Sequence, residues 1–323
     1  MRRMLCAVVA AVLVLSGCST GESEPSDLRI MVPNPPGSGY DVTARTAARA
    51  LGDADIERDV EVFNLPGGGG TVGLRRLMYE RGNADLLMLM GLGVVGSEQT
   101  SGAPVSLADT TPIARLIAEP GIIVVRADSP FRDLGELIAA WRADPSAVAV
   151  GGGSSLGGPD HIAPMLVADE LGIEPSDVDY QRYDGGGDLL AAILSGQVAF
   201  GVSGVSEYPD QVRSGQLRVL AVTGEQRAPG IEAPTLRESG IDVVFTNWRG
   251  IVAPPGLTAE QVSELTAMVS RLHDSPQWRS ALERYGWADA YLEGGEFGAF
   301  IAEESTRLAG TLAALGLGSE GAG

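Results

Sequence analysis

The chain alternates between short apolar runs and longer segments in which apolar residues recur every three or four positions. The short runs are rich in β-branched residues, which predicts strands at 28–32, 86–90, 122–125, 147–150, 198–202 and 217–222. The longer spacing predicts helices at 42–51, 73–80, 134–142, 161–171, 188–194 and 259–272. Alternation of this kind predicts an α/β fold in which helices flank parallel sheets.

The first residues have the pattern of a bacterial lipoprotein export signal. Arg2 and Arg3 precede an apolar stretch over 4–15, and Leu15-Ser16-Gly17 precedes Cys18. This stretch is shorter than the roughly 20 residues of a membrane-spanning helix, and polar residues follow at once. We therefore predict a signal peptide over 1–17, an acylated Cys18 that anchors the protein to the extracytoplasmic face of the cell membrane, and a tether over 18–26.

Charge and composition narrow the classes of partner. The formal net charge is -19, and it becomes -21 when Arg2 and Arg3 leave with the signal peptide. A nucleic-acid partner is not expected, because phosphate backbones attract clusters of Lys and Arg. All 23 cationic residues are arginines, which excludes Schiff-base chemistry and a P-loop lysine. Cys18 would be the only cysteine left, so no disulfide can form within the mature chain.

Glycine-rich turns lie between predicted strands and helices, at 35–41, 66–70, 151–158 and 184–188. In an α/β sheet such turns sit at the carboxyl ends of the strands, where ligands bind. Glycine lets the backbone approach a ligand, and the N–H groups of the turn and of the following helix can hold an anion. Taken one at a time, each turn has the simpler interpretation of a tight connection.

Catalytic sites are poorly supported. The chain has two histidines, His161 and His273, and neither is placed to form a triad or a metal site by its sequence context. Asp160 can cap the helix that holds His161, as Asp41 can cap its own helix and pair with Arg45 four residues on. No metal, cofactor or enzymatic activity is expected. A hydrolase would require Ser154 or Ser155 to meet His161.

Several collinear motifs resemble the tripartite tricarboxylate transporter substrate-binding proteins, the Bug or TctC-type receptors. Two signatures stand near the start, Met31-Val32-Pro33-Asn34-Pro35-Pro36-Gly37-Ser38-Gly39-Tyr40-Asp41 and Asn64-Leu65-Pro66-Gly67-Gly68-Gly69-Gly70-Thr71-Val72-Gly73. Further matches are at 111–115, 128–131, 196–198, 217–223, 233–236 and 248–256. The resemblance covers nearly the whole mature chain.

The resemblance implies a two-lobe Venus-flytrap receptor with the type II periplasmic-binding-protein fold. Lobe 1 would comprise 27–123 and 226–323, and lobe 2 would comprise 124–225. The ligand site would lie in the cleft between the lobes. By the resemblance, its residues are Gly37, Ser38, Gly39, Tyr40, Asp41, Pro66, Gly67, Gly68, Gly69, Gly70, Thr71, Ser154, Ser155, Gly157, Gly158, Asp184, Gly185, Gly186 and Ser203.

The function implied is the capture of a small organic carboxylate, of the di- or tricarboxylate class, by a monomer that delivers it to the membrane subunits of a tripartite tricarboxylate permease. An alternative is a sensor that signals to a membrane histidine kinase. The chain departs from the common family pattern at three places in the site, one of which is Gly158-Pro159-Asp160 in place of a run of Ser and Thr. Tyr40 replaces a small residue or Thr and would narrow the pocket, and Asp184 replaces a Lys and brings a negative charge to the cleft.

Overall fold

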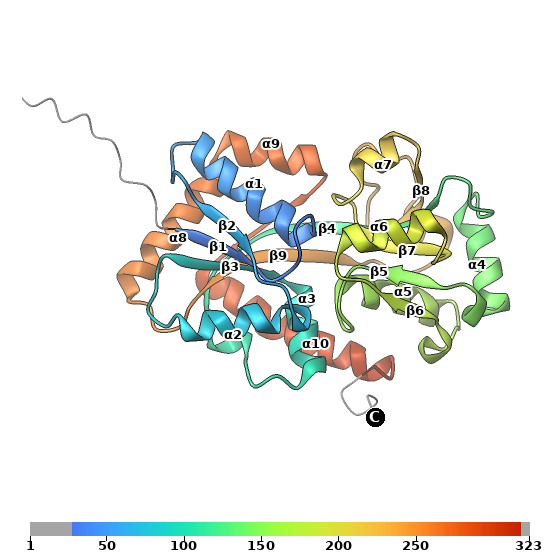
Figure 1. The fold of residues 1–323 in the computed structure, drawn as a ribbon, viewed down its shortest axis with the longest axis horizontal. Coiled ribbons are helices and arrows are strands. Elements are labelled where there is room, and N and C mark those ends of the chain that lie inside the picture. Colours follow the sequence, from blue (N-terminus) through green and yellow to red (C-terminus); the bar gives the residue numbers. More distant parts are fainter. Residues whose placement is uncertain (1–27, 318–323) are drawn as a thin grey trace, which may run out of the picture.

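The computed structural model describes residues 28–317, which form two α/β lobes joined by extended strands (Figure 1). The predicted signal peptide, the tether and Cys18 lie outside the described residues. Within residues 28–317, no helix combines the length and the apolar character that a membrane crossing requires.

Lobe 1 is built on a sheet with strand order β2-β1-β3-β9-β4, and β10 pairs with the other edge of β4. Its strands are β1 (Arg29–Val32), β2 (Glu61–Asn64), β3 (Leu86–Gly91), the first part of β4 (Thr111–Arg126), β9 (Thr246–Ala253) and β10 (Ala288–Glu293). Strands β1, β2 and β3 are parallel, whereas β9 is antiparallel to both β3 and β4. The six residues of β3 are all buried, as expected for a strand with helices on both faces.

Six helices cover the two faces of this sheet. They are α1 (Gly39–Asp53), α2 (Thr71–Tyr79), α3 (Leu92–Ser101), α8 (Ala259–Asp274), α9 (Pro276–Tyr285) and α10 (Gly294–Ala314). Helices α1, α8 and α9 pack together on one face, and α2, α3 and α10 lie on the other (Figure 1). The carboxyl ends of β1, β2 and β3 therefore lead into α1, α2 and α3 at the edge that faces lobe 2.

Lobe 2 repeats this plan on a smaller scale. The second part of β4 pairs with β7 (Phe200–Gly204) and β8 (Leu217–Val222), and β5 (Val150–Gly152) pairs in parallel with β7 and β6 (Tyr180–Arg182). The helices are α4 (Leu134–Ala143), α5 (Pro159–Glu170), α6 (Gly186–Ser195) and α7 (Pro209–Arg213). Helices α5 and α6 follow β5 and β6, so their N-termini point back toward lobe 1.

The predicted helices are all confirmed, within a few residues at their ends, and the α/β class is confirmed. Two expectations are wrong. The sheets are mixed, because β4, β8, β9 and β10 run antiparallel to their neighbours. The strand expected at 147–150 starts only at Val150, since Pro145–Ala147 form a 3₁₀ turn capped by Asp144. Strands β2, β6, β9 and β10 and helices α3, α7, α9 and α10 were not predicted.

One strand, β4, belongs to both lobes. Its residues 111–120 pair with β9, and Gly121–Arg126 pair with β7 and β8. The chain returns to lobe 1 between β8 and β9, beside this crossing. Thr223 joins the two crossings, because its Oγ1 accepts a hydrogen bond from the Gly121 N–H (2.7 Å) and donates one to the Phe245 carbonyl (2.7 Å).

Replacing Thr223 by Val keeps its shape but leaves a buried N–H and a buried carbonyl unsatisfied. We expect Thr223→Val to lower the free energy of unfolding by about 2 kcal/mol. Thr246→Val is the matched control, because Thr246 is exposed at the start of β9 and should change stability by less than about 0.5 kcal/mol. Urea unfolding followed by circular dichroism measures both, and equal effects would show that the Thr223 bonds do not stabilise the crossing.

Candidate functional site

Two adjoining cavities lie where the lobes face each other. The inner cavity, of about 40 Å³, is lined by residues of both lobes: Asn34, Ser38, Gly39, Tyr40, Gly69, Gly93, Gly153, Ser155, Pro159, Asp160, Gly185, Gly186, Glu207, Asn247 and Arg249. The outer cavity, of about 430 Å³, is lined by Pro33, Asn34, Pro35, Pro66, Gly67, Gly68, Gly69, Gly153, Ser155, Arg182, Tyr183, Asp184 and Gly185. Five residues line both cavities, so the two form one interlobe cleft.

Four helices point their N-termini at the inner cavity. Its lining includes Gly39, Gly93, Pro159 and Gly186, which lie in the first turns of α1, α3, α5 and α6. Helix α6 starts after Gly185, whose φ of +93° suits glycine and which has no side chain to cap the helix. Helix N-termini carry partial positive charge and N–H groups, so this convergence favours an anionic group in the cleft.

The cavities bring together eleven of the residues expected from the sequence. Ser38, Gly39, Tyr40, Gly69, Ser155, Gly185 and Gly186 line the inner cavity, and Pro66, Gly67, Gly68 and Asp184 add to the outer one. The other eight residues line neither cavity: Gly37, Asp41, Gly70, Thr71, Ser154, Gly157, Gly158 and Ser203. Several of these eight hold the turns in shape.

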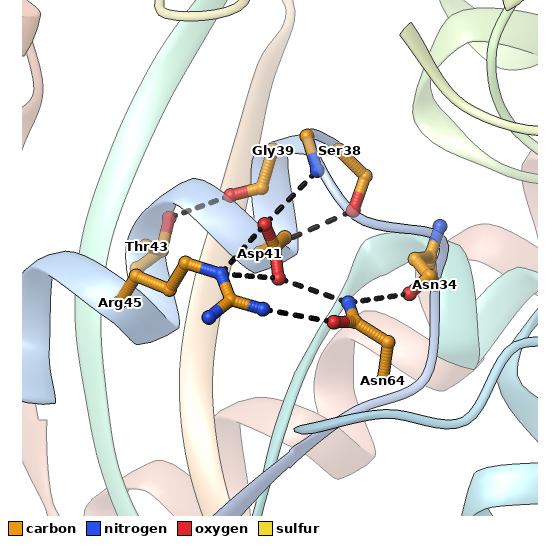
Figure 2. Close-up of polar contacts among 8 residues, drawn as sticks. Asn34, Ser38, Gly39, Asp41, Thr43, Arg45 and Asn64 are labelled. Atoms are coloured by element: carbon orange, nitrogen blue, oxygen red, sulfur yellow. Dashed lines mark hydrogen bonds and ion pairs between the residues drawn. The ribbon is translucent and has the colours of Figure 1, made fainter. Parts of the chain in front are cut away.

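Asp41 illustrates such a supporting role (Figure 2). Its carboxylate accepts hydrogen bonds from the Gly37 N–H, Arg45 Nε and Asn64 Nδ2, at 2.9–3.0 Å. Burial alone would raise the pKa of Asp41, but these three donors lower it overall. The expected pair with Arg45 is confirmed, whereas the N-cap of α1 is Ser38, whose Oγ accepts from the Asp41 N–H. Asp41 thus fixes the first glycine turn against β2.

Ser154 and His161 in lobe 2 likewise hold a glycine turn in shape. Ser154 Oγ accepts a hydrogen bond from the Asp160 N–H, and His161 Nδ1 accepts one from the Gly157 N–H. The N-cap of α5 is therefore Gly158 and not Asp160, whose carboxylate accepts from the Gly153 N–H. Burial lowers the pKa of His161 to about 4, so the ring is neutral. With His161 engaged in this way, the arrangement gives no support to a serine hydrolase.

Tyr40 narrows the cleft, as its size predicted. The side chain is 6% exposed, and its hydroxyl accepts a hydrogen bond from the Gly93 N–H at the start of α3 (3.0 Å). Burial is the main cause that raises the pKa of Tyr40 to about 12, so it stays a neutral phenol. The N-terminus of α3 is thus occupied by the protein's own side chain, whereas Gly39, Pro159 and Gly186 bring the starts of α1, α5 and α6 to the inner cavity.

A buried ion pair behind the cleft was not predicted. Arg249 on β9 pairs with Glu119 on β4, and both side chains are almost completely buried. Glu119 also accepts hydrogen bonds from Ser206 Oγ (2.7 Å) and Trp287 Nε1 (3.0 Å). Arg249 Nη1 donates to Thr43 Oγ1, which in turn donates to the Gly39 carbonyl. The pair therefore links lobe 2, through Ser206, to the start of α1.

Two carboxyl groups face the inner cavity and were also missed. Burial raises the pKa of Glu207 to about 7, with Arg249 opposing and Glu119 adding to the rise. Burial likewise raises the pKa of Asp160 well above its usual range, and Glu207 adds to this effect. The sequence did carry a signal for the buried pair. Arg249 and Glu119 each stand alone in apolar runs, where a charged residue is rarely buried without a partner.

Comparisons with known proteins agree with this geometry. The family model described as "Tripartite tricarboxylate transporter family receptor" matches residues 43–317. A protein of the tcbD-tcbE intergenic region of Pseudomonas sp. strain P51 is 28% identical over 263 residues, which are 79% of this chain and 76% of the relative. Protein BugT of Bordetella pertussis is 27% identical over 291 residues, 88% of each chain.

Solved structures confirm the two-lobe periplasmic-binding fold. A TctC solute-binding protein from Polaromonas shares 29% identity, with a TM-score of 0.62 over 91% of this chain and all of that one. MatC from Rhodopseudomonas palustris, with bound malate, has a TM-score of 0.77 at 23% identity, over 88% of this chain and 98% of MatC. Another R. palustris protein, with adipate, has a TM-score of 0.82 at 21% identity, over 90% of this chain and 97% of that one.

Removing the charge of Glu119 should destabilise the fold more than removing an exposed charge. Glu119→Gln leaves Arg249 buried without a counter-charge, so we expect the free energy of unfolding to fall by about 3–5 kcal/mol. Asp210→Asn is the control, because its pair with Arg213 is exposed and contributes roughly 0–1 kcal/mol. Chemical denaturation compares the two variants. A loss below 1 kcal/mol for Glu119→Gln would contradict the role given to the pair.

Proposed function

Because this chain belongs to the tripartite tricarboxylate transporter receptor family, a family of periplasmic solute-binding receptors, we propose that it captures a small organic carboxylate in the interlobe cleft. The loaded receptor would then deliver the carboxylate to the membrane subunits of a tripartite tricarboxylate permease. MatC with bound malate and a second R. palustris protein with adipate, both of this fold, support a ligand of this class.

The observation that carries the proposal is the convergence of glycine turns and helix N-termini from both lobes on one cleft. Gly69 and Gly185 line both cavities, and they belong to turns on opposite sides of the cleft. A Cβ on Gly69 would crowd Ser155 of lobe 2, and a Cβ on Gly96 in α3 would collide with the Gly157 carbonyl of lobe 2. Only glycine permits this approach of the two lobes, and it leaves backbone N–H groups to face the ligand.

Such a site can hold an anion in spite of the negative net charge. Repulsion between the ligand and distant surface carboxylates is screened beyond about 8–10 Å at ordinary ionic strength. Hydrogen bonds to a charged group contribute roughly 1.5–3 kcal/mol each. Micromolar affinity corresponds to about 8 kcal/mol, so three to five donors of the turns and helix ends are sufficient.

We further propose that ligand binding closes the lobes about the crossings at β4 and at 223–245, with lobe 1 over 27–123 and 226–323 and lobe 2 over 124–225. The three-way contact of Glu119 with Arg249, Ser206 and Trp287 lies beside these crossings and supports a hinge there. The leader pattern supports a protein that works outside the cytoplasm and is tethered at the membrane. We propose that it acts as a monomer.

Blocking the start of α6 should abolish binding. A Cβ on Gly186 would collide with the Glu207 carboxyl, whereas a Cβ on Gly187 would meet nothing within 4 Å. We expect Gly186→Val to lose the thermal stabilisation that a binding carboxylate gives the wild type, and Gly187→Ala to keep it. The screen covers malate, succinate, adipate, citrate, sugars and nucleotides. A response to sugars or nucleotides alone would contradict the proposed function.

The anchor can be tested separately from ligand binding. We expect Cys18→Ser to move the protein from the membrane fraction to the soluble fraction, because the acylated residue is lost. Ligand affinity should not change, since Cys18 is not among the residues that line the cleft. Immunoblots of fractionated cells measure the distribution, and retention of the variant in membranes would overturn the lipid-anchor proposal.

A further inference from the structure

Helix α3 of lobe 1 and the turn at 155–157 of lobe 2 are in contact outside the ligand cleft. The hydroxyl of Thr100 is shared between the Gly96 carbonyl of its own helix (2.9 Å) and the Leu156 carbonyl of lobe 2 (3.2 Å). Gly96 and Gly157 are buried, and a Cβ on Gly157 would lie 3.1 Å from both the Gly96 carbonyl oxygen and Thr100 Cγ2. These four residues, which we call the α3 contact, line neither cavity. They therefore join the lobes without reaching a ligand.

Gly96 is the residue that makes this contact possible. It lies in the interior of α3, where alanine would favour the helix more than glycine does. A Cβ at this position would meet the Gly157 carbonyl, which is backbone and cannot turn away as a flexible side chain could. The sequence therefore gives up some helix stability in lobe 1 and gains a close approach to lobe 2.

Both sides of the α3 contact are held in place from behind. The Gly157 N–H donates a hydrogen bond to His161 Nδ1 (3.0 Å), and the His161 ring packs on Tyr180 with 4.6 Å between the ring centroids. On the other side, Gln99 Nε2 donates to Ser305 Oγ of α10 (2.8 Å), and α3 follows β3 directly. A side chain at position 96 would thus be accommodated more easily by separating the lobes than by bending either side.

We infer that the α3 contact is a latch, which favours the closed arrangement of the lobes before any ligand binds. This inference rests on the lobe closure proposed above, and it adds residues that determine affinity from outside the cleft. The hydrogen bond of Thr100 and the dispersion contacts between the backbones of Gly96 and Gly157 supply the stabilisation.

A latch of this kind acts on every ligand in the same way. A ligand that binds the closed lobes has an apparent dissociation constant equal to the intrinsic constant divided by the closed fraction. Lowering the closed fraction therefore weakens all ligands by one common factor and keeps their order of affinity. A residue that contacts the ligand would instead change the affinities unequally, because each ligand meets it differently.

Two variants weaken the latch and a third is its control. Gly96→Ala places a Cβ against lobe 2, and Thr100→Val removes the shared hydroxyl but keeps Cγ2. Gly310→Ala is the matched control, because Gly310 lies in α10 and a Cβ there would meet nothing within 4 Å. Alanine favours a helix at both glycine positions, so we expect both variants to keep the circular dichroism of the wild type. Gly157 is left unchanged, since its φ of +77° would be strained by any side chain.

The positions of the lobes are measured by double electron–electron resonance on the full chain without ligand. Spin labels are attached at Arg75→Cys on α2 and Glu170→Cys on α5, where both native residues are exposed. The background carries Cys6→Ser and Cys18→Ser, so that the two labelled positions are the only thiols. The distance between the labels changes when the lobes separate, because α2 belongs to lobe 1 and α5 to lobe 2.

We expect Gly96→Ala to lower the ratio of closed to open molecules about tenfold or more, because the added Cβ has no room in the closed arrangement. Thr100→Val should lower the ratio about two- to tenfold, as for the loss of one hydrogen bond. Gly310→Ala should leave it unchanged. Distance distributions that are the same in all three variants and the unsubstituted chain would overturn the latch.

Isothermal titration calorimetry with malate, succinate, adipate and citrate gives a second measurement. We expect Gly96→Ala to weaken each acid that binds the wild type by the same factor, and Gly310→Ala to bind as the wild type does. Unequal factors would show that Gly96 acts on the ligand itself and would overturn the latch. If none of the four acids binds, the carboxylate proposal fails, and the spin-label distances decide the latch independently.

Discussion

The ion pair between Glu119 and Arg249 holds the cleft together. Both charges are buried at the junction of the lobes, where an unpaired charge would cost several kcal/mol, so each side chain fixes the other. Through Ser206 and Trp287 the pair reaches lobe 2 and the β10 side of lobe 1, and through Thr43 it reaches the start of α1. The glycine turns have no side chains to hold them in place. They keep their positions because the ion pair and its hydrogen bonds fix the strands and the start of α1 behind them.

Because of this arrangement, the cleft does not depend on a free cationic side chain to hold an anion. Arg249 is neutralised by its partner, and Tyr40 closes the N-terminus of α3 with its own hydroxyl. Helix α6 follows a glycine cap, and Gly39 and Gly186, the first residues of α1 and α6, line the inner cavity beside Arg249 and Glu207. Selectivity thus arises from which helix ends are filled by the protein and which are left for a ligand, rather than from the sign of the surface charge.

The elements that form the site were largely predictable, but its electrostatics were not. The glycine turns at 35–41, 66–70, 151–158 and 184–188 could be identified from the sequence, because several such turns at the ends of strands together indicate a ligand site where one alone would not. Asp41, Ser154 and Gly157 belong to the same motifs yet support the turns from outside the cleft, a distinction that depends on side-chain direction. Glu207 follows β7 and Asn247 lies near the start of β9, and the two come together because β4 pairs with both of these strands. The spacing of apolar residues could not predict strand β9, because Asn247 and Arg249 interrupt its otherwise apolar, buried run.

The continuity of β4 ties the two lobes to a common register. Side chains alternate between the faces of a strand, and β4 runs through both sheets without a break in the chain. An insertion or deletion of a single residue near Pro120 and Gly121 would turn every later side chain of β4 to the opposite face of the lobe 2 sheet. The strand that joins the lobes therefore tolerates substitutions better than changes in length, which loops and helix ends accommodate more easily.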